Sequence, residues 1–555
     1  AVISCNLQDY EKTKPPEATK TVYPILRQIV NLASVPHEPS LQTELRIAIL
    51  TVNHKKALAG SLRIGCIGLW MAGLKTQVMI MRMRNDKLAA LAVGMTALTA
   101  SAANLTVDFN RDVADFRPAL HSSGYAPQFE QAFQNRWNAS VKDMNFEYSR
   151  THDLGLVNPG SRAYDLQYVF PLIHLDAKDP KNYFFDTTDF MLKMQLGIGQ
   201  KVFYRLGTSI EHTGLVHFAA EIPKDFDKVA EAFAGTMRHY LRGWANGLHD
   251  AVPYWEIWNE PDGRNNMWSF NGNVDDDNAT NNRNAERRDL FVKFFVTVLK
   301  RLKSEFPEVK IGGPALCTWR DDWFRPILRA CKAENLRPDF LSWHYYGSDV
   351  RQLEKMAASA DALCRAEGFE GLEFILNEWH YIPAGGWNYR APETDPDNFN
   401  GINSAAYTLR ALAWFQSSRY DQAYFYGCSH VGSWGFRDYN TAKLNKNFYA
   451  LKAFGDLKRD AAKIVATTSD NDDITCFAVK SADGGKCRIL VVDFFGRGQT
   501  HTVRLGGIGQ GGKVSAVRLS HLENLVPVDV KVRNGAIALR KPDAFSAAWL
   551  ITVER

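Results

Sequence analysis

The feature that most constrains the fold is a regular alternation of short apolar runs and amphipathic segments between residues 116 and 429. The runs are rich in β-branched and aromatic residues, which favour extended backbone. Strands that alternate with helices pair in parallel through right-handed crossovers. Eight such units over roughly 300 residues favour a (β/α)8 barrel, in the α/β class, over an open doubly wound sheet. The predicted barrel strands are 116–124, 146–152, 201–207, 254–262, 309–315, 339–347, 373–381 and 422–429.

Three of the intervening segments carry apolar side chains at helical spacing. Residues 229–241, 290–302 and 353–364 each place these side chains on one face, as expected for helices that cover a barrel. An open nucleotide-binding sheet usually has a glycine-rich phosphate turn after its first strand, and the sequence has none there. The segments therefore also favour the barrel.

The pattern changes at about residue 447. Short alternating runs separated by Gly, Asp and Asn follow, which is typical of an antiparallel β-sandwich. We predict a catalytic barrel over 103–446 and a sandwich over 447–555, to which a short strand at 104–110 is also assigned. Cys476 and Cys487 flank a predicted hairpin, where they either pair or stay as buried thiols.

A different signal occupies residues 81–102. The basic stretch MRMRNDK precedes a short apolar run and then Ala100-Ser101-Ala102, which is the order of a secretory signal peptide. The apolar run is too short to span a bilayer as a helix. We therefore expect a secreted or periplasmic protein, with residues 1–80 an upstream extension unrelated to the fold. The alternative is a genuine N-terminal segment with a buried helix.

The charge of the chain follows the same division. Lys and Arg total 66 against 61 Asp and Glu, a net charge of +5. Residues 1–102 contain twelve basic and six acidic residues, which leaves −1 for residues 103–555. A near-neutral remainder gives no support for a nucleic-acid partner. The cysteines form no CxxC pair or zinc-spaced cluster, so we predict no structural metal and no cofactor.

Two glutamates stand in the same context at the ends of predicted strands. Glu260 follows Trp-Asn and Glu378 follows Leu-Asn, after the fourth and seventh strands by our count. The C-terminal strand ends form the active-site face of such barrels. A buried carboxylate is costly unless it is paired or used. Two carboxylates that face one cavity are the minimum for cleaving a glycosidic bond, since one protonates the leaving oxygen while the other attacks the anomeric carbon.

These motifs resemble a clan of retaining glycoside hydrolases whose acid/base lies on strand four in an Asn-Glu-Pro motif and whose nucleophile lies on strand seven. Within that clan, FEYSRTHDL, EIWNEPD, SWHYYG and the closing sandwich are similar to glycoside hydrolase family 39, over roughly residues 104–555. That family includes β-xylosidases and α-L-iduronidases. The resemblance implies that Glu260 is the acid/base, Glu378 the nucleophile, and Asn259 a ligand of the sugar 2-hydroxyl. The context of Glu378, LNEWHY, differs from the iduronidase pattern, which leaves the substrate open.

The sixth strand is predicted to support the nucleophile. His344 and Tyr346 share a face by alternation, and a phenol there can donate a hydrogen bond to Glu378. The sequence leaves open whether Tyr345 or Tyr346 points inward. Core packing is the alternative for both tyrosines and for His344.

Four more side chains are predicted to bind substrate. Arg150 and His152 share a face at the end of the second strand, where they hold sugar hydroxyls or orient Glu260. His121 after the first strand and Trp434 after the eighth are weaker candidates, with Trp434 as a stacking platform. A structural role is the alternative for each.

We therefore expect a secreted retaining glycoside hydrolase, most like a β-xylosidase, that acts on a largely uncharged glycan. An α-L-iduronidase or another β-glycosidase of the clan is the first alternative, with Arg390 or Arg437 as the basic residue that a uronic acid needs. The alternative of another class is a non-catalytic carbohydrate-binding protein. No membrane span is predicted, and the oligomeric state is left open.

Overall fold

The computed structural model places the chain in two compact units, Ala1–Ser101 and Ala102–Arg555. In the first, β1 (Arg46–Leu50), β2 (Ile64–Met71) and β3 (Leu74–Met81) pair antiparallel. The predicted signal peptide lies outside the described residues, so secretion stays a prediction. The structure describes 46–50, 64–71, 74–81 and 102–554, except 125–140, 153–162, 210–220, 264–267, 271–283, 385, 387–390, 392–393, 429–432, 438–440, 442, 496–497 and 509–511.

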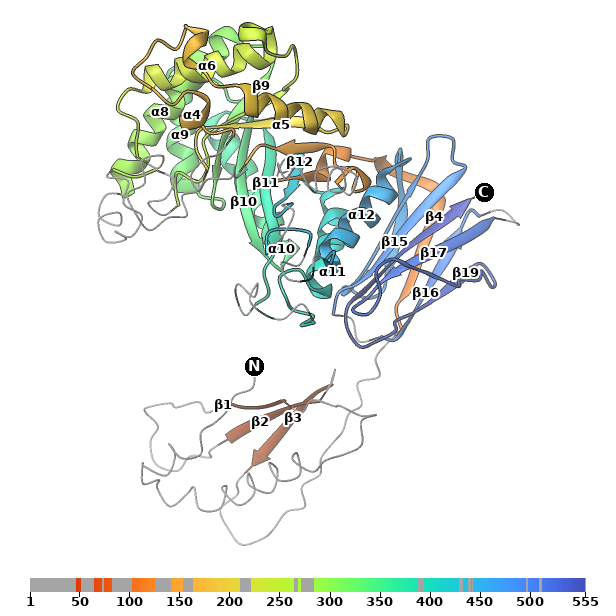
Figure 1. The fold of residues 1–555 in the computed structure, drawn as a ribbon. Helices are drawn as coiled ribbons and strands as arrows, with labels where there is room; N and C mark the ends of the chain where they lie inside the picture. The colour runs from red at the N-terminus through yellow and green to blue at the C-terminus, as the bar shows by residue number, and fades with distance from the viewer. Residues whose placement is uncertain are drawn as a thin grey trace, which may run out of the picture. The chain divides into compact units, whose positions relative to one another are not determined.

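Eight parallel strands of the second unit close into a barrel (Figure 1). Each strand forms in one of the eight predicted runs, with β9 extending one residue beyond its run, and neighbours in the barrel are consecutive in the chain. The predicted fold class is therefore confirmed. The strands are β5 (Ser122–Ser123), β6 (Tyr148–Arg150), β7 (Lys201–Leu206), β8 (Tyr254–Ile257), β9 (Lys310–Leu316), β10 (Phe340–Gly347), β11 (Glu373–Tyr381) and β12 (Gln422–Phe425).

Helices form where the apolar residues recur at helical spacing. In α6 (Phe226–Arg242), Asp225 caps the N-terminus by accepting the Lys228 N–H, and Gly243 ends the helix in the left-handed region at φ 68°. Its apolar face is buried, as in the predicted α8 and α10. The remaining helices are α4 (Leu166–Val169), α5 (Asp186–Gly197), α8 (Asn284–Glu305), α9 (Asp321–Ala333), α10 (Val350–Glu367), α11 (Ile402–Phe415), α12 (Lys446–Lys458) and the 3-10 turns η2 (Pro118–Leu120), η3 (Pro180–Asn182) and η4 (Trp244–Asn246). No helix in the described part of the chain is long and apolar enough to cross a membrane.

The C-terminal strands hydrogen-bond into one nine-stranded, mostly antiparallel sheet that folds over a shared apolar core. The sheet begins later than predicted, because α12 occupies the first residues of the range. Cys476 and Cys487 do not pair with each other, since they lie opposite Val491 and Lys480 in the ladder. The strands are β4 (Asn104–Asp115), β13 (Lys463–Ser469), β14 (Ile474–Lys480), β15 (Lys486–Asp493), β16 (Thr500–Gly506), β17 (Lys513–Leu519), β18 (Val526–Val528), β19 (Ala536–Arg540) and β20 (Ala547–Glu554).

Strand β4 joins the start of the second unit to its C-terminal sheet. It pairs antiparallel with β13 and parallel with β16. Leu105, Val107 and Phe109 alternate with exposed residues and are buried in the core of the sheet. The short strand predicted at 104–110 therefore belongs to the sheet. Its residues pair with residues of β13 that lie more than 350 positions further along the chain.

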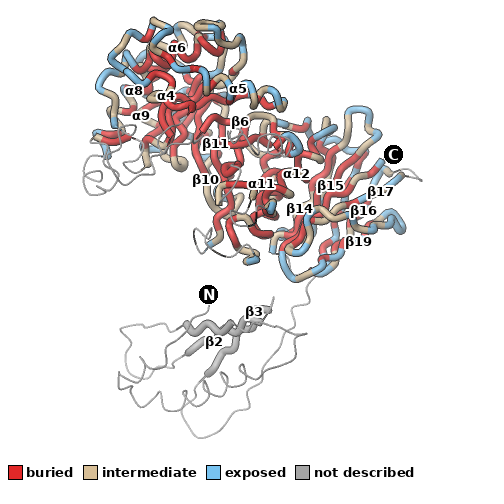
Figure 2. The backbone as a smooth tube through the Cα atoms, in the orientation of Figure 1, coloured by how far each residue is buried: buried red, intermediate tan, exposed pale blue. Residues whose placement is uncertain are grey.

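Helices α11 and α12 lie between the barrel strands and the sheet (Figure 1). Leu412 of α11 and Phe454 of α12 belong to the same buried cluster as Phe477 of β14 and Leu490 of β15. Buried backbone accordingly continues from the barrel strands through these helices into the sheet (Figure 2).

The barrel interior changes from aromatic to polar toward the C-terminal strand ends. Phe203, Phe340, Ile375 and Tyr424 form an apolar layer against which Tyr148 and Tyr254 pack. Side chains alternate along a strand, so residues two positions further on face the next layer. That layer holds a set of fully buried polar side chains, Arg150, Glu256, Ser342 and Asn377.

Leu105→Ala should lower the free energy of unfolding by about 2–5 kcal/mol, because it opens a cavity in the sheet core. Thr106→Ala, one residue along on the exposed face, should change it by less than about 1 kcal/mol. Thermal melts of both variants would check this. Equal effects at the two positions would contradict the integration of β4 into the core.

Candidate active site

Two glutamates face each other at the C-terminal end of the barrel. Glu260 lies three residues beyond β8, and Glu378 lies near the end of β11. An oxygen of each carboxylate and Nδ1 of His344 all lie within 4.8 Å of one another. The side chains are 19% and 5% exposed, so Glu260 is the more accessible. The predicted pair of carboxylates is therefore brought together.

Glu260 is presented by a strained turn. The backbone is left-handed at both Trp258 (φ 73°) and Glu260 (φ 44°), which costs a bulky residue of order 1–3 kcal/mol. The Trp258 N–H donates to Leu206 O at 2.7 Å, and the Glu260 N–H donates to Ala315 O at 2.9 Å. The Trp258 ring packs directly against Gly207, where the Cβ of any other residue would lie 2.7 Å from the ring. Neighbouring strands thus hold Glu260 in a conformation that its own sequence disfavours.

Arg150 connects the two halves of the site from within the barrel. Its Nε donates to Glu256 Oε2 at 2.7 Å, Nη1 to Glu378 Oε1 at 2.8 Å and Nη2 to Asn259 Oδ1 at 2.7 Å. Burial alone would lower the pKa of Arg150, but the Glu256 and Glu378 carboxylates raise it. The guanidinium is thus charged and bonded to protein groups, which fits the structural alternative given for Arg150, and a contact with a sugar hydroxyl stays a prediction.

Glu378 lies among hydrogen-bond donors. Tyr346 Oη donates to its Oε2 at 2.7 Å, in addition to the Arg150 bond to Oε1. His152 Nε2 lies 3.3 Å from Oε1, and His344 Nδ1 lies 3.3 Å from Oε2. Two hydrogen-bond donors and two imidazoles thus lie around the Glu378 carboxylate.

The structure settles which tyrosine points inward. Tyr345 directs its hydroxyl to Asp349 O, away from the carboxylates, whereas Tyr346 contacts Glu378. Burial, followed by the charges of Glu378 and Glu260, raises the pKa of Tyr346 well above its usual value. The phenol therefore keeps its proton and acts as a donor.

Glu260 has a different set of neighbours. His344 Nδ1 lies 2.8 Å from Glu260 Oε1, and burial lowers the pKa of His344 to about 3. The imidazole is therefore neutral near pH 7, so Glu260 has a neutral partner where Glu378 has a cation. Environments this different favour different protonation roles for two nearby carboxyls.

A second carboxyl lies close to Glu260. The Asp262 side chain is 1% exposed, and its Oδ1 accepts the Cys317 N–H at 2.9 Å. Burial raises the pKa of Asp262 to about 7, and the charge of Glu260 adds to the shift. Burial and the same two carboxyls raise the pKa of the Cys317 thiol. A neutral thiol and a carboxyl whose pKa lies near 7 thus flank Glu260 on this side.

An aromatic wall stands beside Glu378. The Trp434 ring lies 5.7 Å from Tyr346, 5.0 Å from Tyr426 and 4.8 Å from Phe399, measured between centroids. Trp434 is half-buried, so part of its surface stays accessible. This is the position expected of a stacking platform, and that role stays a prediction.

His121 is the predicted site residue that lies elsewhere. It precedes β5 instead of following it, and its ring packs 4.8 Å from Phe146 and 5.1 Å from Phe454. In a parallel barrel the residue before a strand lies at the N-terminal end, opposite the site. The prediction of a sugar contact for His121 is therefore wrong.

Several site residues were not predicted from the sequence. Glu256 accepts from Arg150, from Ser342 Oγ at 2.6 Å and from Asn377 Nδ2 at 2.8 Å. Counting by two from the inward-facing Tyr254 would have identified Glu256, but the choice of face needs the strand boundaries. Asp262 and Cys317 meet through a loop geometry that no local pattern indicates.

One group of described residues offers three atoms suited to a metal ion, namely Glu260, His344 and Glu378. His344 already contacts both carboxylates, and the Arg150 cation lies 2.8 Å from Glu378. A cation would have to displace these contacts. The absence of a metal requirement stays a prediction.

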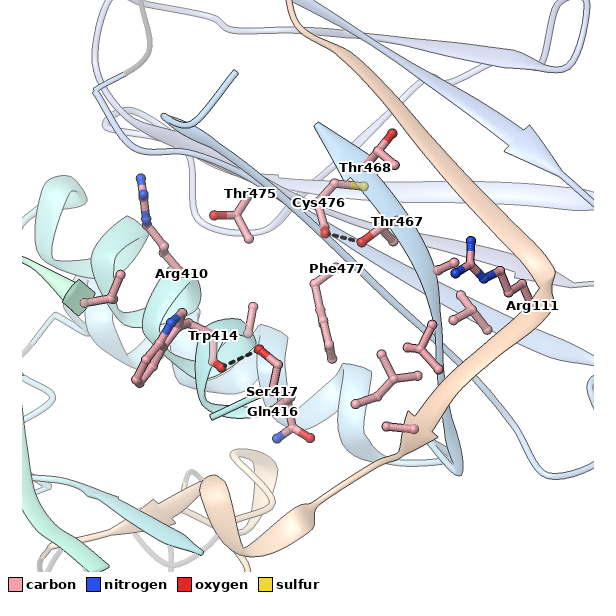
Figure 3. Close-up of a pocket in the computed structure, with 17 residues that line it drawn as sticks. Arg111, Arg410, Trp414, Gln416, Ser417, Thr467, Thr468, Thr475, Cys476 and Phe477 are labelled. Carbon is pink, nitrogen blue, oxygen red and sulfur yellow. Dashed lines mark hydrogen bonds between the residues drawn. The ribbon is translucent and has the colours of Figure 1, made fainter. Parts of the chain in front are cut away.

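A separate pocket of about 600 Å³ opens between α11 and strands β13 and β14 of the sheet. Trp414 of α11 and Ser417, two residues beyond its end, line one side, and Thr467 and Phe477 line the other (Figure 3). None of the residues that line it belongs to the carboxylate site. It is therefore distinct from the site described above.

Asp262→Asn should stabilise the protein at high pH. The folded pKa is raised from 3.8 to about 7, so the folded state binds this proton more tightly than the unfolded state does. That contribution to stability is complete below pH 4 and is lost as the pH rises through 7. The variant should melt about 5 °C higher than the wild type at pH 8 and near it at pH 4. Exposed Asp289→Asn should show no such difference, and a lower melting temperature for Asp262→Asn at both pH values would contradict the assignment.

Comparison with known proteins agrees with this architecture. Over 127 residues the chain is 28% identical to a β-xylosidase from Geobacillus stearothermophilus, a match that covers 23% of this chain and 22% of that protein. A glucosidase from Croceicoccus marinus has a similar structure, with a TM-score of 0.65 and 20% identity over 82% of this chain and 99% of that one. A family 51 α-L-arabinofuranosidase from Thermotoga petrophila gives a TM-score of 0.53 at 15% identity, over 82% and 100% of the two chains. At these identities the structural likeness shows the fold alone.

The family assignment comes from the barrel sequence. Residues 103–413 match the family described as "Glycosyl hydrolases family 39", which is more than half of the chain. The match includes both glutamates and most of the polar layer beneath them. The predicted resemblance is thus confirmed, and the chain belongs to glycosyl hydrolase family 39.

Proposed function

We propose that the protein is a glycosidase that cleaves glycosidic bonds with retention of anomeric configuration. The observation that carries the proposal is the approach of the Glu260 and Glu378 carboxylates, which have oxygens within 4.8 Å of each other. Retaining enzymes hold their carboxyl groups about 5–5.5 Å apart, whereas inverting enzymes need about 6.5–9.5 Å to admit a water molecule. The short separation supports a double displacement.

The surroundings assign the two roles. Glu378 receives bonds from Arg150 and Tyr346, which suit an ionised nucleophile. Glu260 is more accessible and has the neutral His344 as its partner, which suits a group that must carry a proton in one step and lose it in the next.

The reaction then runs in two balanced steps. A Glu378 oxygen bonds to the anomeric carbon as the bond to the leaving oxygen breaks, and Glu260 gives its proton to that oxygen. Glu260, now ionised, takes a proton from water, whose oxygen bonds to the anomeric carbon and releases Glu378. Asn259 is oriented by Arg150, since its Oδ1 accepts the Arg150 bond, and in this proposal its amide nitrogen donates to the sugar 2-hydroxyl.

For the substrate we favour a β-linked neutral sugar, with β-xylosidase activity first. The partial match to a β-xylosidase and the aromatic wall beside Glu378 support this choice. Arg150 is committed to Glu256 and Glu378 and so does not serve a uronate. An α-L-iduronidase stays the alternative through Arg437 or through Arg390, which lies outside the described residues. Secretion is proposed from residues 81–102 alone.

A panel of aryl glycosides tests this proposal and its rival, a non-catalytic carbohydrate-binding protein. The panel holds β-xylosides, β-glucosides, β-galactosides, α-L-arabinofuranosides and α-L-iduronides. The proposal predicts hydrolysis of a β-glycoside whose first-formed sugar, observed by NMR, keeps the β configuration. Binding of glycans without hydrolysis of any member would favour the rival.

Glu378→Ala should lower kcat by about 10³-fold or more, because no group is left to form the glycosyl-enzyme. Added azide should restore turnover and give a glycosyl azide of inverted configuration. Glu373→Ala, five residues earlier on the same strand, should stay near wild type, since this carboxylate lies at the other end of β11. Activity that survives Glu378→Ala without azide would remove the residue from the nucleophile role.

Glu260→Ala should affect substrates according to their leaving groups. A dinitrophenyl glycoside needs little protonation, so its kcat/KM should fall by less than about 10-fold. A methyl or alkyl glycoside should lose about 10²–10⁴-fold. The comparison comes from kcat/KM values for a series of aryl glycosides whose phenol leaving groups differ in acidity. A uniform loss along the series would argue against acid catalysis by Glu260.

A further inference from the structure

Arg150 contacts two carboxylates on opposite sides, and the reaction proposed above uses only one of them. Glu378 lies 2.8 Å from Nη1 toward the substrate, and Glu256 lies 2.7 Å from Nε within the barrel. Arg150 and Glu256 are fully buried. A single buried positive charge is therefore shared between two negative ones.

Glu256 is fixed more firmly than an ion pair alone would require. Its Oε2 accepts from Arg150, while its Oε1 accepts from Ser342 Oγ of β10 at 2.6 Å and from Asn377 Nδ2 of β11 at 2.8 Å. Donors from three strands thus occupy both oxygens. Below Glu256 lies the aromatic layer against which Tyr254 packs, and Glu256 itself is fully buried.

The charge balance changes when the glycosyl-enzyme forms. Glu378 then carries an ester and is neutral, while the negative charge has moved to Glu260, which has given up its proton. Arg150 loses the anion at Nη1, and a buried cation without a counter-ion is strongly unfavourable. Glu256 is the carboxylate that still contacts the guanidinium at this stage.

We propose that Glu256 is the permanent counter-ion of Arg150 and a positioning residue for the nucleophile, because it limits how much of the guanidinium charge acts on Glu378. This inference rests on the proposed double displacement. Without Glu256, the whole charge of Arg150 would fall on Glu378. The carboxylate would then be overstabilised before attack, and Arg150 would be left unpaired after it.

The test compares Glu256→Gln with the wild type in the pH dependence of kcat/KM. The acidic limb reports the ionisation that creates the free nucleophile. Removing a neighbouring negative charge should move this limb about one pH unit lower, with a 10–100-fold loss of kcat/KM on the plateau. Glu373→Gln removes a half-exposed carboxylate from the same strand as Glu378 and should leave both quantities unchanged.

Glu256→Asp and Ser342→Ala separate charge from packing. Both variants keep the negative charge beside Arg150. The acidic limb of their kcat/KM profiles should therefore stay at the wild-type pH, even where kcat/KM itself falls. A rate loss in Glu256→Gln with an unmoved limb would overturn the inference and leave Glu256 a structural residue. An inactive wild type would instead refute the proposed function itself.

A stability measurement tests the counter-ion role without relying on activity. It stays informative even if Glu256→Gln folds poorly. Glu256→Gln alone should lower the melting temperature by about 5 °C or more, because Arg150 is left without its permanent partner. The double variant with Arg150→Gln should melt higher than Glu256→Gln alone, because the buried cation that lacked its permanent partner is gone, while Glu378 keeps the hydrogen bond from Tyr346. The pairing of Glu256 with Arg150 would be contradicted if the double variant lost as much melting temperature as the two single variants together, or more.

Discussion

The buried guanidinium of Arg150 is the interaction on which the site depends. It reaches Glu256, Asn259 and Glu378 at 2.7–2.8 Å, and these residues come from the fourth and seventh strands of the barrel and the turn that follows the fourth. A charge with no exposed surface persists in a protein only when such partners compensate its loss of hydration. The same bonds that stabilise the charge therefore fix the position of Glu378 relative to Asn259, the residue that precedes Glu260.

The rest of the barrel supports this arrangement from below and from the sides. The aromatic layer packs beneath the polar layer, in which Arg150 is fully buried. The turn at Glu260 adopts left-handed dihedral angles that only its bonds to neighbouring strands make tolerable. Arg287 of α8 holds the loop beyond it by donating to Pro261 O and Gly263 O. Local strain at the site is thus balanced by hydrogen bonds made by residues distant in the sequence.

Much of this could be predicted from the sequence, because it depends on local periodicity. The eight runs became the eight strands, and Glu260 and Glu378 were found because both end a strand in the same Asn-Glu context. His121 was misplaced since the first strand is two residues long and begins later than its apolar run suggests. Alternation placed His344 and Tyr346 on one face of the strand, but it could not say whether that face or the face of Tyr345 points into the barrel. The role of Glu256 depends on contacts among three strands and was beyond any local pattern.

Arg150 and Tyr346 converge on Glu378, and the central claim is that this residue forms a covalent bond to the sugar. The most direct measurement is mass spectrometry of the protein after reaction with an activated 2-deoxy-2-fluoro glycoside, which slows release of the intermediate. The account predicts a mass increase of one fluorosugar and, after digestion, its location on the peptide that contains Glu378. Rapid turnover with no adduct, or an adduct on Glu260, would contradict it.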